Sequence, residues 1–105
     1  MRMELRRGSL VMAALTALQS EAYGYALRRR LSDVGLEVDE GTLYPLIRRL
    51  EDQGLLESRW DASDEGRRRR YYTISDQGRA LLEELQTEWE SIRQSLDQLT
   101  QSSPS

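Results

Sequence analysis

The stretch that decides the fold of this 105-residue chain is residues 39–54, DEGTLYPLIRRLEDQG. Its large aliphatic side chains recur at the i, i+3, i+4 and i+7 spacing of one helix face. These side chains are Leu43, Leu46, Ile47 and Leu50. Asp39 is a suitable N-cap, Gly54 is suited to end the helix, and Pro45 is tolerated near the start. The stretch predicts a helix with one buried face.

The next residues, 55–74 (LLESRWDASDEGRRRRYYTI), change from helical to alternating periodicity. Two alternating segments flank the turn-like residues 61–66, a pattern typical of a β-hairpin. Four arginines at residues 67–70 begin its returning arm. We expect the inner face of the hairpin to pack on the helices through Leu56, Trp60, Tyr72 and Ile74.

Helical periodicity also predicts helices over residues 4–19 and 23–34, the second of them capped by Gly35 in a left-handed conformation. Ser75-Asp76 opens a last helix that we expect to run to residue 100. Residues 101–105 are expected to form a disordered tail.

The order helix, helix, helix, hairpin, long helix predicts a fold that is mainly α with a small β-hairpin. We interpret residues 1–75 as a winged helix-turn-helix domain for DNA binding and residues 76–100 as a C-terminal dimerisation helix. The link between the second and third helices looks longer than the usual 3–4-residue turn. The basic hairpin that follows nevertheless favours a winged helix, with the third helix sized for the major groove.

The last helix carries an apolar seam with heptad spacing, which predicts a homodimer. The seam consists of Leu85, Trp89, Ile92, Leu96 and Leu99. About two heptads are too short for a free-standing coiled coil, so the first helix of one or both protomers should complete the contact. The alternative is that the seam packs only on its own domain. A dimer would present two recognition helices to two half-sites of a pseudo-palindrome.

The net charge of −3 argues at first against a nucleic-acid partner, but the charge is unevenly distributed. All 15 basic residues are arginines, and 14 of them lie within residues 1–79 beside 13 acidic residues. Residues 80–105 contain 1 arginine and 5 acidic residues. The acidic balance therefore belongs to the last helix, which would face away from DNA.

Composition excludes several other function classes. Without Cys or His, the chain has no disulfide, no Cys- or His-based zinc site and none of the usual general bases. We expect no catalytic residue, no metal and no cofactor, and therefore no enzyme activity. No apolar run approaches the length of a membrane span, and the start lacks a cleavage site typical of a signal peptide. A cytoplasmic location follows as an expectation.

Several short motifs occur together in a specific order. They are Leu5-Arg6-Arg7-Gly8, Tyr23-Gly24-Tyr25, Glu40-Gly41-Thr42-Leu43-Tyr44-Pro45, Arg49-Leu50-Glu51, Gly54-Leu55 and Gly66-Arg67-Arg68-Arg69-Arg70-Tyr71-Tyr72. From about Leu5 to Leu96 the chain resembles the PadR family of bacterial transcriptional regulators, in its compact branch. The resemblance implies a dimeric winged-helix repressor of an operator in double-stranded DNA, released by a small-molecule effector or a stress signal.

The resemblance also implies the DNA-contacting positions. They are Tyr23, Gly24, Thr42, Tyr44 and the wing residues Gly66, Arg67, Arg68 and Arg69, of which Arg67 and Arg68 should reach DNA most freely. Tyrosine hydroxyls donate to phosphates, glycine allows close backbone approach, and a helix N-terminus attracts anions. Alternatively, the tyrosines are half-buried packing residues, Thr42 bonds its own helix and the arginines are a solvated turn.

Arg48 is the best candidate for reading a base, because arginine pairs bidentately with guanine in the major groove. A surface ion pair with Asp52, four residues on, is the alternative. The three arginines at residues 28–30 belong to the predicted second helix, and we interpret them as ordinary exposed helix residues.

Similar compact regulators line a drug-binding pore with an aromatic residue at the position of Trp89. An effector pocket between protomers would then contain Trp89 and Arg93, with Val11 and Met12 as walls, although Arg93 would oppose a cationic ligand. Two other hypotheses stand beside the repressor: a multidrug-type sensor built on Trp89, and a winged-helix module that binds protein through the acidic last helix.

Overall fold

The computed structural model describes residues 2–64 and 67–102, with the side chains of residues 8–62 and 68–101. The elements are α1 (Arg2–Ala17), β1 (Ala22–Tyr23), α2 (Gly24–Asp33), α3 (Glu40–Asp52), β2 (Leu56–Asp64), β3 (Arg67–Ile74) and α4 (Asp76–Ser102). The predicted fold class, mainly α with a small antiparallel sheet in a winged helix, is confirmed.

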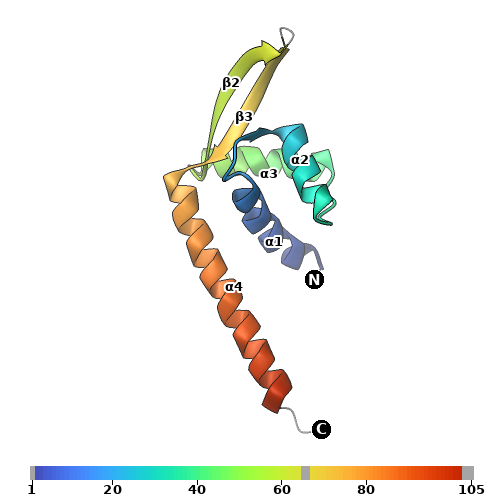
Figure 1. Cartoon of the computed structure of the whole chain (residues 1–105), viewed down its shortest axis with the longest axis vertical. Coiled ribbons are helices and arrows are strands. Elements are labelled where there is room, and N and C mark those ends of the chain that lie inside the picture. The colour runs from blue at the N-terminus through green and yellow to red at the C-terminus, as the bar shows by residue number, and fades with distance from the viewer. Residues whose placement is uncertain (1, 65–66, 103–105) are drawn as a thin grey trace.

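The molecule is elongated, with extents of 64 × 26 × 20 Å. Figure 1 shows α1, α2 and α3 gathered at its centre, the β2–β3 hairpin projecting from them in one direction and α4 in the other. The hairpin, which we call the wing, and the far half of α4 therefore lie at opposite ends of the molecule.

The core forms where α1, α2 and α3 meet the base of the wing. The predicted apolar face of α3 is buried, each of Leu43, Leu46, Ile47 and Leu50 being at most 6% exposed. It packs with Leu15 and Leu18 of α1, Leu27 and Leu31 of α2, Leu56 and Ile74 of the wing and Leu82 of α4.

The sheet is three-stranded, with the order β1-β3-β2 and antiparallel pairing throughout. The sequence interpretation missed β1 and wrongly began the second helix at Tyr23. Tyr23 pairs with Tyr71 of β3, so α2 starts one residue later, at Gly24. The helix predicted over residues 4–19 runs instead from Arg2 to Ala17.

The wing strands are longer than predicted, because residues 61–64 belong to β2 and not to a turn. Pairing shifts register between Asp61 and Asp64, and the tip residues 65 and 66 lie outside the described part of the chain. The expected burial of Trp60 is wrong, since its side chain is 53% exposed. Leu56 and Ile74 pair at the base of the wing and reach the core, whereas Trp60 pairs with Arg70 farther along the wing.

Glycines and a serine end and begin the helices as the sequence predicts. Gly35 and Gly54 have φ angles of +88° and +80°, the left-handed conformation expected after a helix. Ser75 Oγ accepts a hydrogen bond from the Gly78 amide at 3.0 Å and donates one to the Gly54 carbonyl at 2.6 Å. Asp39 precedes α3 as predicted, but its side chain makes no capping bond.

One of the three α2 arginines has a structural role that the sequence interpretation did not predict. Arg30 donates to the carbonyl oxygens of Ala17, Ser20 and Glu21 at 2.9, 2.8 and 3.1 Å. These carbonyls lie at and just after the end of α1, where helix carbonyls have no partner within the helix. Arg30 therefore ties α2 to the end of α1.

α4 runs to Ser102, two residues beyond the predicted end, so residues 101 and 102 of the expected tail are helical. Residues 103–105 lie outside the described part of the chain. Leu85 is partly buried against the core, but the rest of the predicted seam is 53–67% exposed: Trp89, Ile92, Leu96 and Leu99. Among the described helices, none is long and apolar enough to cross a membrane.

Candidate nucleic-acid interface

An open groove of about 310 Å³ lies between the wing and helices α2 and α3. It is lined by Tyr23, Gly24, Tyr25, Tyr44, Ile47, Arg48, Trp60, Arg69, Arg70 and Tyr72. Five of these were predicted from sequence as DNA contacts: Tyr23, Gly24, Tyr44, Arg48 and Arg69. The fold thus gathers on one concave surface residues that are widely separated in the sequence.

Two of the other predicted DNA contacts, Thr42 and Arg68, are described by the structure and are not among the residues that line this groove. Thr42 is exposed in the first turn of α3, and Arg68 is exposed on β3. Arg67 begins β3, but its side chain is not among those described, and Gly66 lies outside the described residues.

Tyr23 is half-buried in a cluster of aromatic rings. Its ring meets Tyr71 edge-on at a centroid distance of 5.6 Å and stacks on Tyr25 at 6.5 Å. The guanidinium of Arg69 lies 4.5 Å above the same ring, within the range of a cation–π contact. Tyr23 is therefore a packing residue and also a wall of the groove.

The structure gives a packing reason for the glycine at position 24, which the sequence alone did not reveal. A Cβ atom at this position would lie 3.0 Å from Cε1 of Tyr44, closer than side chains normally approach. The absence of a side chain lets the Tyr44 ring lie against the start of α2, with the ring also packed on the core.

Arg48 is exposed on α3 at the groove. Within the described part of the chain it makes no hydrogen bond or ion pair, so the alternative of a pair with Asp52 is not formed. Its guanidinium remains available to an external acceptor.

Trp60 is the groove residue that sequence reasoning missed, because it was assigned to the core. Two guanidinium groups lie within cation–π distance of its ring, that of Arg68 at 4.9 Å and that of Arg70 at 5.5 Å from the centroid. The strand register explains the arrangement, since Trp60 pairs with Arg70 and the three side chains share one face of the hairpin.

Glu51, near the end of α3, holds both strands of the wing. Arg70 Nη2 donates to the two carboxylate oxygens of Glu51 at 3.1 and 2.9 Å, and Arg70 Nε donates to Ser58 Oγ at 3.0 Å. The Ser58 hydroxyl in turn donates to Glu51. Burial disfavours the Glu51 charge, but these hydrogen bonds outweigh it and lower the pKa of the carboxyl below its ordinary value.

A second set of ion pairs fixes the opposite side of the wing. Arg59 donates to both carboxylate oxygens of Glu21 at 2.7 Å and to Asp61 at 3.2 Å, and it lies 5.0 Å over the Tyr71 ring. The hydrogen bond from Arg59 lowers the pKa of Glu21. Two of the wing arginines, Arg59 and Arg70, are therefore already paired with carboxylates.

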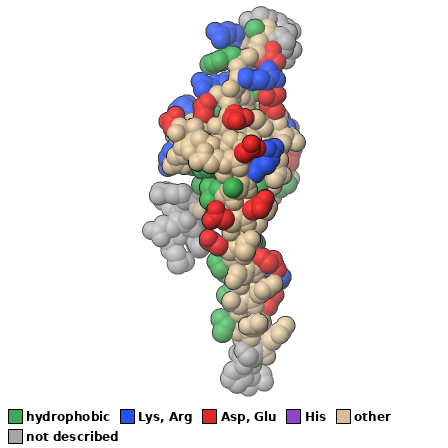
Figure 2. Space-filling view, turned by 90° about the vertical axis from the view of Figure 1, so that its left-hand side faces the viewer, with side chains coloured by type: hydrophobic (Ala, Val, Ile, Leu, Met, Phe, Trp, Pro, Cys, Tyr) green, Lys and Arg blue, Asp and Glu red, His purple; other side chains and the backbone are tan. Residues whose placement is uncertain are grey.

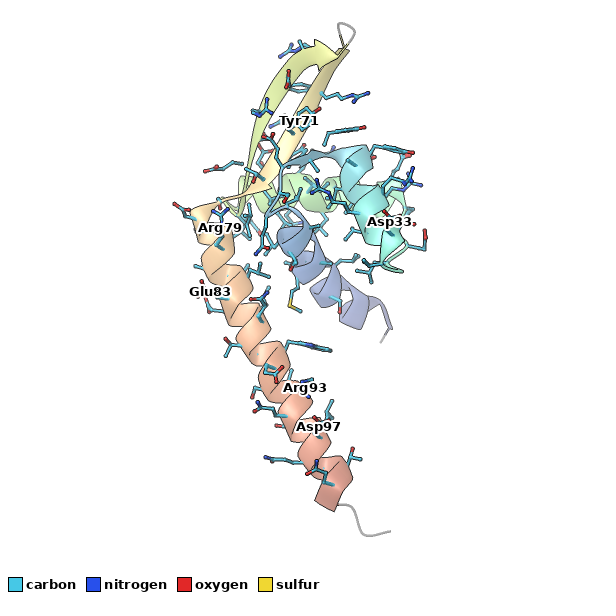
Figure 3. The ribbon with its side chains drawn as sticks, viewed as in Figure 1. Asp33, Tyr71, Arg79, Glu83, Arg93 and Asp97 are labelled. Carbon is cyan, nitrogen blue, oxygen red and sulfur yellow. The ribbon has the colours of Figure 1, made fainter. Side chains whose placement is uncertain are left out.

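Charge is distributed unevenly along the molecule. Figure 2 shows basic side chains on the wing, with acidic ones among them, and mostly acidic side chains along α4. The arginine of the far part of α4, Arg93, donates to Glu90 and, at 2.8 Å, to Asp97; Figure 3 labels Arg93 and Asp97 on neighbouring turns. The surface around the groove is thus the part of the molecule best suited to a polyanion.

The predicted effector residues lie on two helices. Val11 and Met12 are partly buried against the core on α1, which packs against α4. Trp89 is 56% exposed on α4, one turn before Arg93. Among the described residues, no group of three or more His, Cys, Asp or Glu side chains is placed to hold a metal ion.

Comparison with known proteins identifies the family. The profile of the transcriptional regulator PadR-like family matches residues 11–84. A PadR family transcriptional regulator from Eggerthella lenta superposes with a TM-score of 0.86 at 44% identity, covering 98% of this chain and 91% of that one.

Two further relatives agree. A PadR-like transcriptional regulator from Bacillus cereus gives a TM-score of 0.84 at 33% identity, over 95% of this chain and 99% of that one. A transcriptional regulator of Mycobacterium tuberculosis is 46% identical over 68 residues, which are 65% of this chain and 63% of the mycobacterial protein. The chain therefore belongs to the PadR-like family of DNA-binding transcriptional regulators, which are not enzymes.

Proposed function

We propose that this chain is a dimeric transcriptional repressor that binds a pseudo-palindromic operator in double-stranded DNA and is released by a small-molecule effector. Members of the family bind DNA and regulate transcription. The observation that carries the finer proposal is the groove between α3 and the wing, which collects five of the DNA contacts expected from sequence.

In this proposal α3 enters the major groove with its first turns facing the bases. Arg48 reads a guanine edge, because its guanidinium is exposed and has no carboxylate partner in the described part of the chain. Thr42, Tyr44 and Tyr23 donate to phosphates beside it, where they fix the register of the helix on the duplex.

The wing then follows the sugar–phosphate backbone. Arg67, Arg68 and Arg69 supply the positive charge, and the glycine at position 66 allows the backbone to come close to a phosphate. The inner arginines Arg59 and Arg70 take no direct part, because each is already bound to carboxylates. Binding through few exposed cations predicts modest affinity for random DNA and strong dependence on salt.

A gel-shift titration with the DNA upstream of the gene, repeated over a salt series, tests this proposal. Arg68→Ala should weaken binding and reduce the slope of log affinity against log salt by about 1, with about twice that reduction for the double variant with Arg67→Ala. Arg79→Ala is the matched control. It removes the same charge from the first turn of α4, near the base of the wing (Figure 3).

Binding by the control should equal that of the unaltered chain. A salt slope that does not respond to Arg68→Ala and Arg67→Ala would contradict the proposed wing contacts.

The exposed apolar stripe of α4 supports the dimer. Trp89, Ile92, Leu96 and Leu99 are all more than half exposed in the single chain, which is costly for a continuous apolar seam. We assign residues 76–100 as a dimerisation helix attached to a DNA-binding domain of residues 1–75. A two-fold axis along this seam would leave the two wings free to contact two half-sites.

The repressor role is tested by transcription in vitro from the upstream region. Addition of the protein should lower the transcript in proportion to operator occupancy. An increase in transcript would identify an activator instead. Such a regulator would act in the bacterial cytoplasm, where its operator lies.

Effector binding at Trp89 is favoured by one observation. Arg93 is compensated by Glu90 and Asp97, so its charge no longer opposes a cationic planar ligand at the seam. In Trp60→Phe, which leaves Trp89 as the only indole, planar ligands of this class should quench fluorescence and release DNA. Quenching without DNA release would favour the alternative of a multidrug-type sensor. The third hypothesis, a protein-binding module without DNA, is set aside by membership of a DNA-binding family.

A further inference from the structure

Trp60 occupies a place on the wing that packing does not explain. More than half of its side chain, 53%, is exposed, although a tryptophan normally contributes most by burial. Its indole N–H donates to no acceptor within the described part of the chain. The residue also lines the groove that faces the recognition helix.

The ring is held in place despite its exposure. The guanidinium of Arg70 lies 5.5 Å from the ring centroid and is itself fixed by two bonds to Glu51 of α3 and one to Ser58 of β2. The guanidinium of Arg68 lies 4.9 Å from the same centroid. A rigid aromatic side chain loses little conformational entropy on binding, so the wing presents a preorganised apolar surface beside two cationic groups.

We propose that Trp60 is a DNA-contacting residue of the wing, with its indole face packed on a deoxyribose and its N–H directed to a neighbouring phosphate. The alternation of apolar sugar and anionic phosphate along a DNA strand matches the indole and the adjacent Arg68. Because the backbone carries no base information, this contact adds affinity and no sequence preference. The inference rests on the proposed function, since it assumes that the wing lies along the operator.

Three measurements on Trp60→Ala and Trp60→Phe test the contact. Trp60→Ala should lower affinity about tenfold, a difference of roughly 1.4 kcal/mol, by the same factor for operator and scrambled DNA. Its salt slope should stay unchanged, because the indole is uncharged. Trp60→Phe should retain most of the affinity, since it keeps an aromatic face.

Intrinsic fluorescence gives the direct readout. The chain has 2 tryptophans, so a change on adding DNA that occurs in the unaltered protein and vanishes in Trp60→Phe comes from residue 60. Circular dichroism on Trp60→Ala checks that the fold is kept, and if this variant fails to fold, Trp60→Phe and the fluorescence titration decide.

The outcomes separate the contact from the proposed function. Operator binding by the unaltered chain with equal binding by Trp60→Ala, or without a Trp60 signal, would overturn the contact alone. A salt slope in Trp60→Ala that falls as it does in Arg68→Ala would also overturn it, by showing that the ring only supports the arginine. Failure of the unaltered chain to bind its operator would overturn the proposed function, and the contact with it.

Discussion

Gly78 is a residue of α4 that leaves no room for a side chain against the wing base. A Cβ atom there would lie 2.2 Å from the Leu55 carbonyl oxygen and 2.8 Å from Cγ1 of Ile74. Both atoms belong to packed, hydrogen-bonded structure, so Gly78→Ala should lower the free energy of unfolding by about 1–3 kcal/mol. Gly8→Ala, in α1 with no atom within 4 Å, should raise it by roughly 0.5–1 kcal/mol. Chemical denaturation measures both, and equal effects would contradict this packing.

Glu51 gives the stability of the wing a dependence on pH. Its pKa is lowered from 4.5 in the folded chain, so the ionised carboxylate stabilises the fold fully above the unfolded value. That contribution is lost as the pH falls through the folded value. Glu51→Gln should therefore reduce the free energy of unfolding at pH 7 by roughly 1 kcal/mol. In thermal unfolding, the difference in stability between the unaltered chain and Glu51→Gln should shrink as the pH falls below about 4.5. A stability difference that does not narrow as the pH falls below 4.5 would contradict this role of Glu51.

At the scale of elements, one arginine strengthens the joint between the end of α1 and helix α2. Arg30 supplies three hydrogen bonds to carbonyls at the end of α1, whereas its neighbour Arg29 has only a 3.4 Å contact with Tyr25. Arg30→Ala should destabilise the protein by roughly 1–2 kcal/mol. Arg29→Ala removes the same charge from the same helix and should change stability little. If thermal unfolding shows the two variants alike, the arginine does not hold this joint.

The elements with regular periodicity could be predicted, and those that depend on distant partners could not. The buried face of α3 follows from the spacing of Leu43 to Leu50 alone. β1 is only two residues long and exists because Tyr23 pairs with Tyr71, a contact between residues far apart in sequence. Trp60 has the right alternation for the inner face, but alternation does not tell how far a hairpin projects beyond its core.

The candidate site shows the same division. The motif residues converge on one groove, as the resemblance implied. The pairings that orient the wing could not be predicted, because Glu51, Ser58 and Arg70 come from three elements. The sequence interpretation assigned Arg67, Arg68 and Arg69 to DNA and gave Arg70 no role, but it could not reveal that Arg70 is bound to Glu51 or that Arg68 lies on the Trp60 ring.

At the scale of the whole molecule, the proposed DNA-binding and dimerisation surfaces lie at opposite ends of a molecule 64 Å long. The wing carries arginines and acidic residues together, whereas α4 is mostly acidic (Figure 2). The net charge of −3 therefore conceals an uneven distribution, with 14 arginines beside 13 acidic residues in residues 1–79 and 1 beside 5 in residues 80–105. Because α4 projects away from the wing, its acidic side chains would lie far from the phosphates of DNA bound at the wing. The apolar stripe between its acidic side chains is the surface through which we propose that two chains assemble.

Ile92→Glu tests that assembly. Ile92 is 53% exposed at the middle of the stripe, and a glutamate there would place a charge from each protomer at the proposed two-fold contact. We expect monomers by light scattering and a loss of operator affinity of about a hundredfold or more, because each half-site then binds without its linked partner.

Gln94→Glu adds the same charge on the opposite face of α4 and should leave both the dimer and the affinity intact. The winged-helix domain of Ile92→Glu should stay folded, since this side chain takes no part in the buried core. A dimer that survives Ile92→Glu would show that the stripe is not the interface.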